Sequence, residues 1–103
     1  MTGTLSTRAG RIRTVVQRAF APERLEIEDD SARHAGHAGA RAEGETHFTI
    51  TMVSRVFTGQ GRLARARAVH EALAAEFGTG LHALSLVLRT PEEEERQGGP
   101  PKA

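Results

Sequence analysis

A Gly- and Ala-rich segment between two alternating stretches constrains the fold of this chain more than any other feature. Before the segment, Leu25 and Ile27 alternate with glutamates. After it, residues 47–54 alternate large apolar side chains with mostly β-branched ones. Alternation of this kind is typical of half-buried strands. Two strands that flank one loop pair most simply as an antiparallel hairpin, here with an unusually long connection.

Two further apolar patterns repeat with helical spacing. The first predicts a helix that begins near Thr7 and ends before Pro22, because a proline cannot continue the helical hydrogen-bond ladder. Its apolar stripe consists of Ile12, Val16, Ala19 and Phe20. The second predicts the main helix over residues 62–77, which Gly78 closes. Its apolar members are Leu63, Ala66, Val69, Leu73 and Phe77.

Residues 81–89 predict a third strand, one face of which carries His82, Leu84, Leu86 and Leu88. Pro91 and the glutamates at 92–95 then predict a short charged helix, whose acidic side chains we expect to face solvent. The order is α-β-β-α-β, an α+β fold with a three-stranded mixed sheet covered on one face by helices. Because a helix joins the second and third strands, we expect them to be parallel with a right-handed crossover.

Composition limits the number of domains and the chemistry. With 103 residues and 38% hydrophobic content, the chain predicts one small domain at 7–90, after a flexible N-terminus (1–6) and before an acidic, then Gly/Pro-rich tail (91–103). No apolar run is long enough for a membrane span or a secretory signal, so we expect a soluble, cytoplasmic protein. Cysteine is absent, which excludes disulfides and thiolate ligands from this chain.

Three histidines are candidate metal ligands: His34 and His37 in the Gly/Ala-rich segment, and His82 at the start of the third strand. The alternative is that His34 and His37 are solvated loop residues and that His82 is a strand-end residue hydrogen-bonded to a neighbouring carbonyl. A zinc hydrolase would need all three in one coordination shell with an open water position, which the sequence disfavours. No nucleophile elbow or triad pattern surrounds any Ser or Thr, so we expect no enzymatic activity. For His47 the pattern predicts a surface or structurally supporting position, with a contact that tunes neighbouring metal-ligating residues as the alternative, and for His70 partly buried packing.

The arginines at the start of the main helix, Arg62, Arg65 and Arg67, are candidates for contact with nucleic-acid phosphates. The alternative is a solvated helix face. The formal net charge of +1 lacks the strong positive field of dedicated nucleic-acid binders. With four Phe and no Tyr or Trp, a base-stacking platform is not expected either.

Three stretches of the chain form a recognisable combination: RHAGHAG, GETHFTITMVSRVFTGQGRLARARAVHEAL and LHALSL. With them the chain resembles, over residues 11–90, the BolA family of small stress-associated proteins. The family fold is similar to the class II KH arrangement, which agrees with the α-β-β-α-β order above. Between the helices, however, this chain has no GxxG phosphate clamp of the KH type.

The resemblance implies a non-enzymatic adaptor that shares a [2Fe-2S] cluster with a monothiol glutaredoxin, which supplies a cysteine and glutathione to one iron. His82 and a loop histidine, His34 or alternatively His37, are then the ligands from this chain. The family also contains DNA-binding transcriptional regulators of stress response and morphology. If this chain is such a regulator, we expect the arginines of the main helix to contact double-stranded DNA. Without a partner, we expect a monomer or a weak homodimer.

Overall fold

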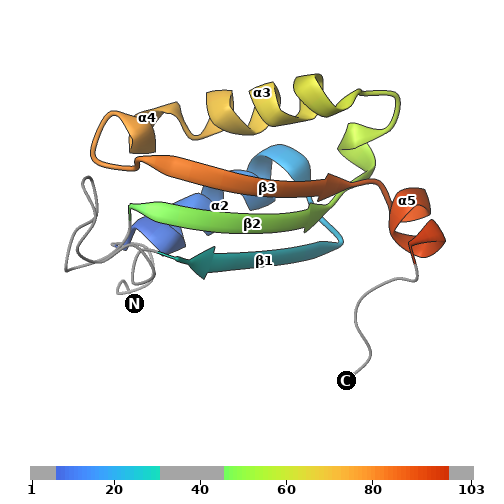
Figure 1. Ribbon diagram of the computed structural model, residues 1–103, viewed down its shortest axis with the longest axis horizontal. Helices are drawn as coiled ribbons and strands as arrows, with labels where there is room; N and C mark the ends of the chain where they lie inside the picture. Colours follow the sequence, from blue (N-terminus) through green and yellow to red (C-terminus); the bar gives the residue numbers. More distant parts are fainter. Residues whose placement is uncertain (1–6, 31–45, 98–103) are drawn as a thin grey trace.

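The computed structural model describes residues 7–30 and 46–97. His34 and His37 lie outside the described residues. The elements in chain order are α2 (Arg8–Phe20), β1 (Arg24–Asp29), β2 (His47–Val53), the 3₁₀ turn η2 (Arg55–Phe57), α3 (Arg62–Ala72), α4 (Ala74–Phe77), β3 (Ala83–Arg89) and α5 (Pro91–Arg96) (Figure 1). The predicted α+β order is confirmed.

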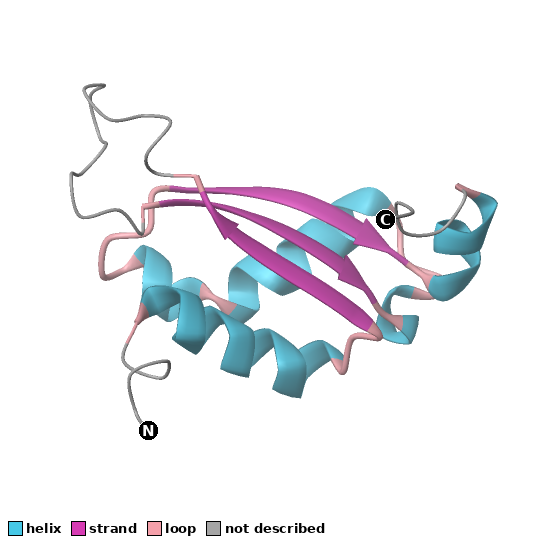
Figure 2. Cartoon of the chain, turned by 90° about the horizontal axis from the view of Figure 1, so that it is seen from below, coloured by secondary structure: helices cyan, strands magenta, loops and turns pink. Residues whose placement is uncertain are grey.

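The strands form one three-stranded sheet in the order β1-β2-β3. β1 and β2 are antiparallel, with Ile27 opposite Ile50, while β2 and β3 are parallel, with Ile50 opposite Leu86. Figure 2 shows that α2 and α3 both lie on the same face of the sheet. The mixed sheet covered on one face by helices is therefore confirmed.

The core lies between this face and the helices. The central strand β2 contributes Phe48, Ile50 and Met52, each at most 1% exposed, because alternate side chains of a strand point to the same face. The helices and the η2 turn add the other fully buried large side chains: Ile12, Val16, Phe57, Val69 and Leu73. Burial of this set holds the sheet at a fixed place under the helices.

The first helix begins and ends close to the predicted residues. The hydroxyl of Thr7 accepts a hydrogen bond from the Gly10 N–H at 3.0 Å, which caps the helix. At the other end Ala21 adopts a left-handed conformation (φ 43°), and Pro22 follows. The predicted stripe was wrong at Ala19, which is exposed although it lies close to the buried face of the helix.

The main helix is interrupted rather than continuous over 62–77. Leu73 (φ −103°, ψ 18°) separates α3 from α4 and is itself buried. Leu63, predicted to be apolar core, is 63% exposed because it lies about 120° around the helix from the buried Val69. His70 is also exposed, contrary to expectation, and its ring stacks on Phe77 at a centroid distance of 5.1 Å.

The last strand is shorter than predicted, and the last helix is better anchored. β3 begins at Ala83, so His82 precedes the strand. The expectation that α5 faces solvent was wrong for Glu94, which is 7% exposed and pairs with Arg24 and Arg89. Among the described residues no helix has both the length and the apolar character needed to cross a membrane.

Candidate functional site

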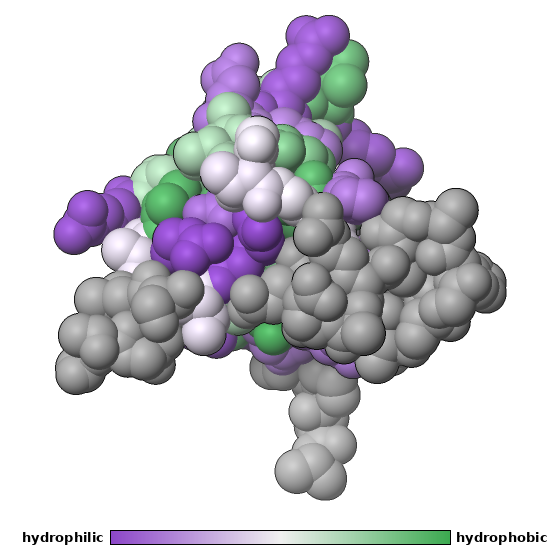
Figure 3. Space-filling view, turned by 90° about the vertical axis from the view of Figure 1, so that its left-hand side faces the viewer, coloured by the Kyte–Doolittle hydropathy of each residue, from purple (hydrophilic) through white to green (hydrophobic). Residues whose placement is uncertain are grey.

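One end of the sheet carries both ends of the segment 31–45 and two histidines. We call it the histidine end, made of Asp30, Thr46, His47 and His82. The Asp30 N–H donates to the His47 carbonyl at 2.7 Å, and the His82 N–H donates to the Thr46 carbonyl at 2.8 Å. The residues that flank the segment with His34 and His37 therefore both lie at this end of the sheet, with Thr46 bonded to His82 and Asp30 on the other side of His47. Figure 3 looks onto this side of the molecule, where hydrophilic residues gather at the surface.

His82 is exposed, yet its backbone is held on both sides. Leu81 before it is buried in the core at 3% exposure. Ala83 after it starts β3, pairs with His47 in the parallel register, and donates its N–H to the Thr46 carbonyl at 3.2 Å. The imidazole is thus presented to solvent from a fixed point of the backbone, as a ligand for an external group requires.

His47 lies beside His82, with the two ring centroids 5.9 Å apart and the rings inclined at 58°. Nδ1 of His47 is 2.8 Å from the hydroxyl of Thr46, a residue that is 2% exposed. The interpretations of His47 from its sequence position were a surface or structurally supporting location, or a contact that tunes neighbouring metal-ligating residues. Its proximity to His82 depends on the parallel register of β2 and β3, which the local sequence does not reveal.

A charged network supports the turn before His82. Arg8 donates through Nη1 to the carboxylate of Glu76 (2.7 Å) and to its main-chain carbonyl (3.1 Å). The same carbonyl accepts the N–H of Leu81 at 3.0 Å. Arg11 donates to the other carboxylate oxygen at 2.8 Å. The hydrogen bond from Arg11, together with the charges of both arginines, outweighs burial and lowers the pKa of Glu76.

The sequence analysis did not identify this network. Its members are separated by more than sixty residues, since Glu76 lies in α4 and both arginines lie in α2. The pattern gave no signal beyond the polar character of Glu76 among apolar neighbours. A charged residue in a mostly apolar stretch next to a candidate ligand is the one hint that was available.

The described residues contain no cluster of three His, Asp or Glu side chains arranged as a metal site. His82 would therefore need further ligands from outside them. An imidazole is a suitable donor for iron, including one iron of a [2Fe-2S] cluster. The exposed ring of His82, attached beside a segment with two more imidazoles, is chemically compatible with such a group.

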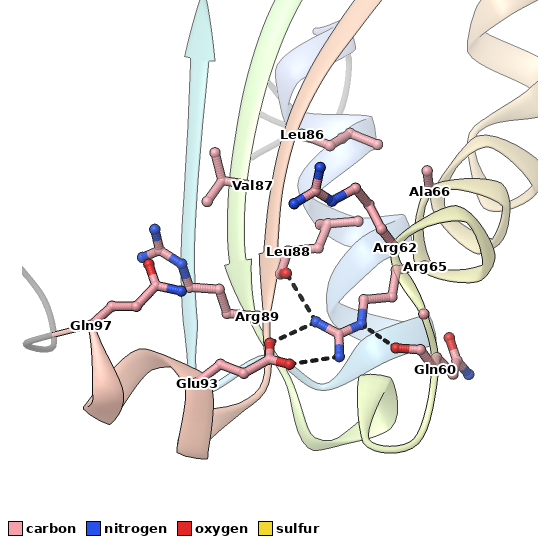
Figure 4. A pocket seen from close by; sticks show the side chains of 11 residues that line it. Gln60, Arg62, Arg65, Ala66, Leu86, Val87, Leu88, Arg89, Glu93 and Gln97 are labelled. Carbon is pink, nitrogen blue, oxygen red and sulfur yellow. Dashed lines mark hydrogen bonds and ion pairs between the residues drawn. The ribbon is translucent and has the colours of Figure 1, made fainter.

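The three arginines of the main helix have different surroundings. Arg62 and Arg67 are exposed. The side chain of Arg65 is only 12% exposed and forms two hydrogen bonds, of 2.7 and 2.9 Å, to the carboxylate of Glu93 (Figure 4). It also donates to the main-chain carbonyls of Gln60 (2.8 Å) and Leu88 (3.2 Å). This geometry makes Arg65 part of the structure and disfavours its predicted role at phosphates.

The bidentate pair also changes the acidity of its carboxylate. The hydrogen bonds from Arg65, followed by one from the Thr90 main chain, lower the pKa of Glu93 to about 2. Glu93 is therefore ionised at neutral pH and joins α5 to α3. A T-x-x-E capping box was readable at positions 90–93, and its reciprocal hydrogen bonds are present.

Comparison with known proteins agrees with the fold. Residues 16–93 match the family model described as BolA-like protein. The chain is 46% identical to BOLA1, a chloroplastic protein of Arabidopsis thaliana, over 93 residues that make up 88% of this chain and 58% of that protein. It is 41% identical to the DNA-binding transcriptional regulator BolA of Escherichia coli, over 82% of this chain and 77% of that protein.

Comparison with solved structures also finds similarity to BolA proteins. The BolA domain of SufE1 from Arabidopsis thaliana superposes with a TM-score of 0.77 at 42% identity, covering 85% of this chain and 96% of that one. The chain belongs to the BolA family. It spans only 58% of Arabidopsis BOLA1 and 25% of the Arabidopsis SufE-like protein 1, so those relatives contain regions that this chain does not match.

Proposed function

We propose that this BolA-family protein is a non-enzymatic adaptor that docks a monothiol glutaredoxin and completes a bridging [2Fe-2S] cluster. We expect it to act in the cytoplasm, in cluster trafficking or iron sensing. His82 is one ligand from this chain, and His34 or His37 is the other. The observation that carries the proposal is the position of His82: exposed, fixed in the chain by the buried Leu81, and hydrogen-bonded through its main chain to Thr46, the residue that follows segment 31–45.

The chemistry of the donors supports this assignment. The chain has no cysteine, so imidazoles are the ligands it offers that suit iron in a cluster. When bound, a cluster with two imidazole ligands has a higher reduction potential than one with four thiolates. The remaining thiolates come from the partner. The role of this chain is to hold His82 at a defined angle and to keep the second imidazole within reach.

The test uses purified protein mixed with a monothiol glutaredoxin, glutathione, ferrous iron and sulfide. We expect a visible absorption and circular dichroism spectrum that differs from that of the glutaredoxin homodimer. His82→Ala should abolish the difference, whereas His70→Ala, which removes an exposed histidine of α3, should preserve it. Separate His34→Ala and His37→Ala variants identify the second ligand. A mixture whose spectrum never departs from that of glutaredoxin alone would refute the proposal.

DNA binding is the second candidate, which the name of the Escherichia coli relative suggests. The exposed Arg62 and Arg67 support it, whereas Arg65 is occupied by Glu93. If these arginines contact phosphates, the affinity for a DNA duplex should fall steeply with salt, and the slope should decrease by about one for each arginine replaced by alanine. Duplex binding unaffected by both substitutions would exclude this surface.

A further inference from the structure

The far end of β3 forms one wall of a groove. The groove has a volume of about 700 Å³ and lies between the first turn of α3, the second half of β3 and α5 (Figure 4). We call it the β3 groove. It is at the opposite end of β3 from His82, because its strand residues are Leu86, Val87, Leu88 and Arg89. The proposed cluster site therefore does not occupy it.

The strand that borders the groove has a free edge. In the described sheet, β2 is the hydrogen-bonded neighbour of β3 and no strand pairs with its other side. The Arg89 carbonyl accepts from Ser54, which follows β2, whereas the Leu88 carbonyl accepts from Arg65 on the groove side. Because main-chain groups alternate along a strand, the N–H and C=O groups of Leu84 and Leu86 also point outward.

These outward groups form a short template for another strand. Edge strands with unpaired N–H and C=O groups accept an added chain, and main-chain hydrogen bonds then provide much of the affinity. Arg65 already occupies the Leu88 carbonyl, so the available edge ends there. The groove also contains an unused acceptor: the side-chain oxygen of Gln60 is buried and receives no donor from the described residues. The outward carbonyls of β3 and the Gln60 side-chain oxygen are hydrogen-bond acceptors, and the N–H groups of a peptide backbone are suitable donors for them.

The charges at the groove select the kind of peptide. Two of its arginines are neutralised internally, Arg65 by Glu93 and Arg89 by Glu94. Arg62 is exposed, and no carboxylate of the described residues pairs with it. In Figure 4 its side chain extends from α3 toward the strand. Arg62 therefore offers a positive charge to an external partner, and a carboxylate is the group that complements it.

We propose that the β3 groove binds an extended acidic peptide segment of a partner protein, which adds to the free edge of β3 at Leu84 and Leu86 and places a carboxylate at Arg62. The groove and Arg62 lie at the far end of β3 from His82, although the peptide would extend along the edge as far as Leu84, and the proposal does not depend on the cluster site. Peptide binding at Arg62 requires backbone N–H groups of the ligand, whereas DNA binding at Arg62 does not. An experiment can therefore distinguish the two kinds of ligand.

The probe is the blocked peptide Ac-TVEVEVT-NH2, titrated into ¹⁵N-labelled full-length protein. We expect it to shift the amide signals of Leu84 and Leu86 and to slow their hydrogen exchange, because these N–H groups become hydrogen-bonded. The lysine counterpart Ac-TVKVKVT-NH2 should bind roughly tenfold more weakly. A copy of the acidic peptide N-methylated at its three central residues should give no protection, since it cannot form the ladder.

Matched variants test the charge. Arg62→Glu should weaken binding of the acidic peptide about tenfold, whereas Arg67→Glu, on the same helix but outside the groove, should change it by less than about twofold. Absence of amide protection at millimolar peptide, or equal losses in the two variants, would overturn the proposal. So would a DNA duplex that shifts the same amides when the acidic peptide does not, because the groove would then be a nucleic-acid surface.

Discussion

Glu76 shows how a single residue positions the candidate ligand. Its side chain is buried between α4 and α2, where two arginines hold its carboxylate, and its main-chain carbonyl binds both Arg8 and Leu81. A buried carboxylate is tolerated only when it is paired and hydrogen-bonded. The same contacts that neutralise it hold the turn that leads to His82.

Removal of this carboxylate should therefore destabilise the fold. Glu76→Ala removes the buried carboxylate that accepts hydrogen bonds from Arg8, whose side chain is 11% exposed, and from Arg11. We expect a loss of about 2 to 4 kcal/mol in the free energy of unfolding, measured by urea denaturation. Glu71→Ala, at an exposed position of α3, is the control and should stay within about 0.5 kcal/mol of the wild type. Equal stability of both variants would show that the network adds nothing.

At the scale of elements, α5 is the clearest case of a short helix that depends on its surroundings. It has six residues, too few to be stable alone. Its first turn is capped by Thr90, and Glu93 and Glu94 bind arginines of α3, β1 and β3. Through Glu93 and Glu94 these contacts anchor α5 at the end of the sheet, whereas Glu92 and Glu95 are exposed to solvent.

The cap can be tested with one pair of variants. The Thr90 hydroxyl accepts the Glu93 N–H at 3.2 Å, and Thr90 itself is 5% exposed. Thr90→Ala should lower the free energy of unfolding by about 1 kcal/mol, whereas Thr90→Ser keeps the hydroxyl and most of the stability. Urea denaturation of the two proteins gives the comparison. If serine were no better than alanine, the hydroxyl would not be the stabilising group.

The Arg65–Glu93 pair predicts a defined pH dependence. The folded protein holds the pKa of Glu93 at about 2, below its ordinary value of 4.5, so the folded state binds this proton less readily than the unfolded state. Its stabilisation is complete above pH 4.5 and decreases as the pH falls toward 2. The difference in urea midpoint between wild type and Glu93→Gln should therefore be largest at neutral pH and shrink across this range. A difference that stays constant down to pH 2 would contradict this assignment.

At the scale of the whole molecule, the parallel strand β3 connects two surfaces of different chemistry. Its first residues follow His82 at the histidine end, and its last residues line the β3 groove. The two surfaces have no residue in common. Their functions should be separable, because substitutions without shared partners usually act independently.

Both variants, His82→Ala and Arg62→Glu, should be measured in two assays: the cluster spectrum with glutaredoxin and the amide protection by the acidic peptide. His82→Ala should remove the distinctive cluster spectrum while the acidic peptide still protects Leu84 and Leu86. Arg62→Glu should do the reverse, and the double variant should combine both losses without further effect. Loss of both activities in each single variant would show that the two ends are coupled.

The local patterns were sufficient for the architecture. Alternation at 25–28 and 47–53 identified two strands of the sheet, and helical spacing with Pro22 and Gly78 gave the order of elements. Each of these signals depends on residues within a few positions of one another. They failed at Leu63 and Leu73, where the orientation of the helix and its interruption depend on what packs against it.

The sequence by itself also determined the residue types available for chemistry: histidines without cysteine, and arginines at the start of the main helix. Only the tertiary structure decided their roles. The parallel register brought His47 beside His82, and the docking of α5 turned Arg65 from a candidate phosphate ligand into a structural ion pair. The physical reason is that contacts between distant segments are set by packing of the whole core, which no local pattern encodes.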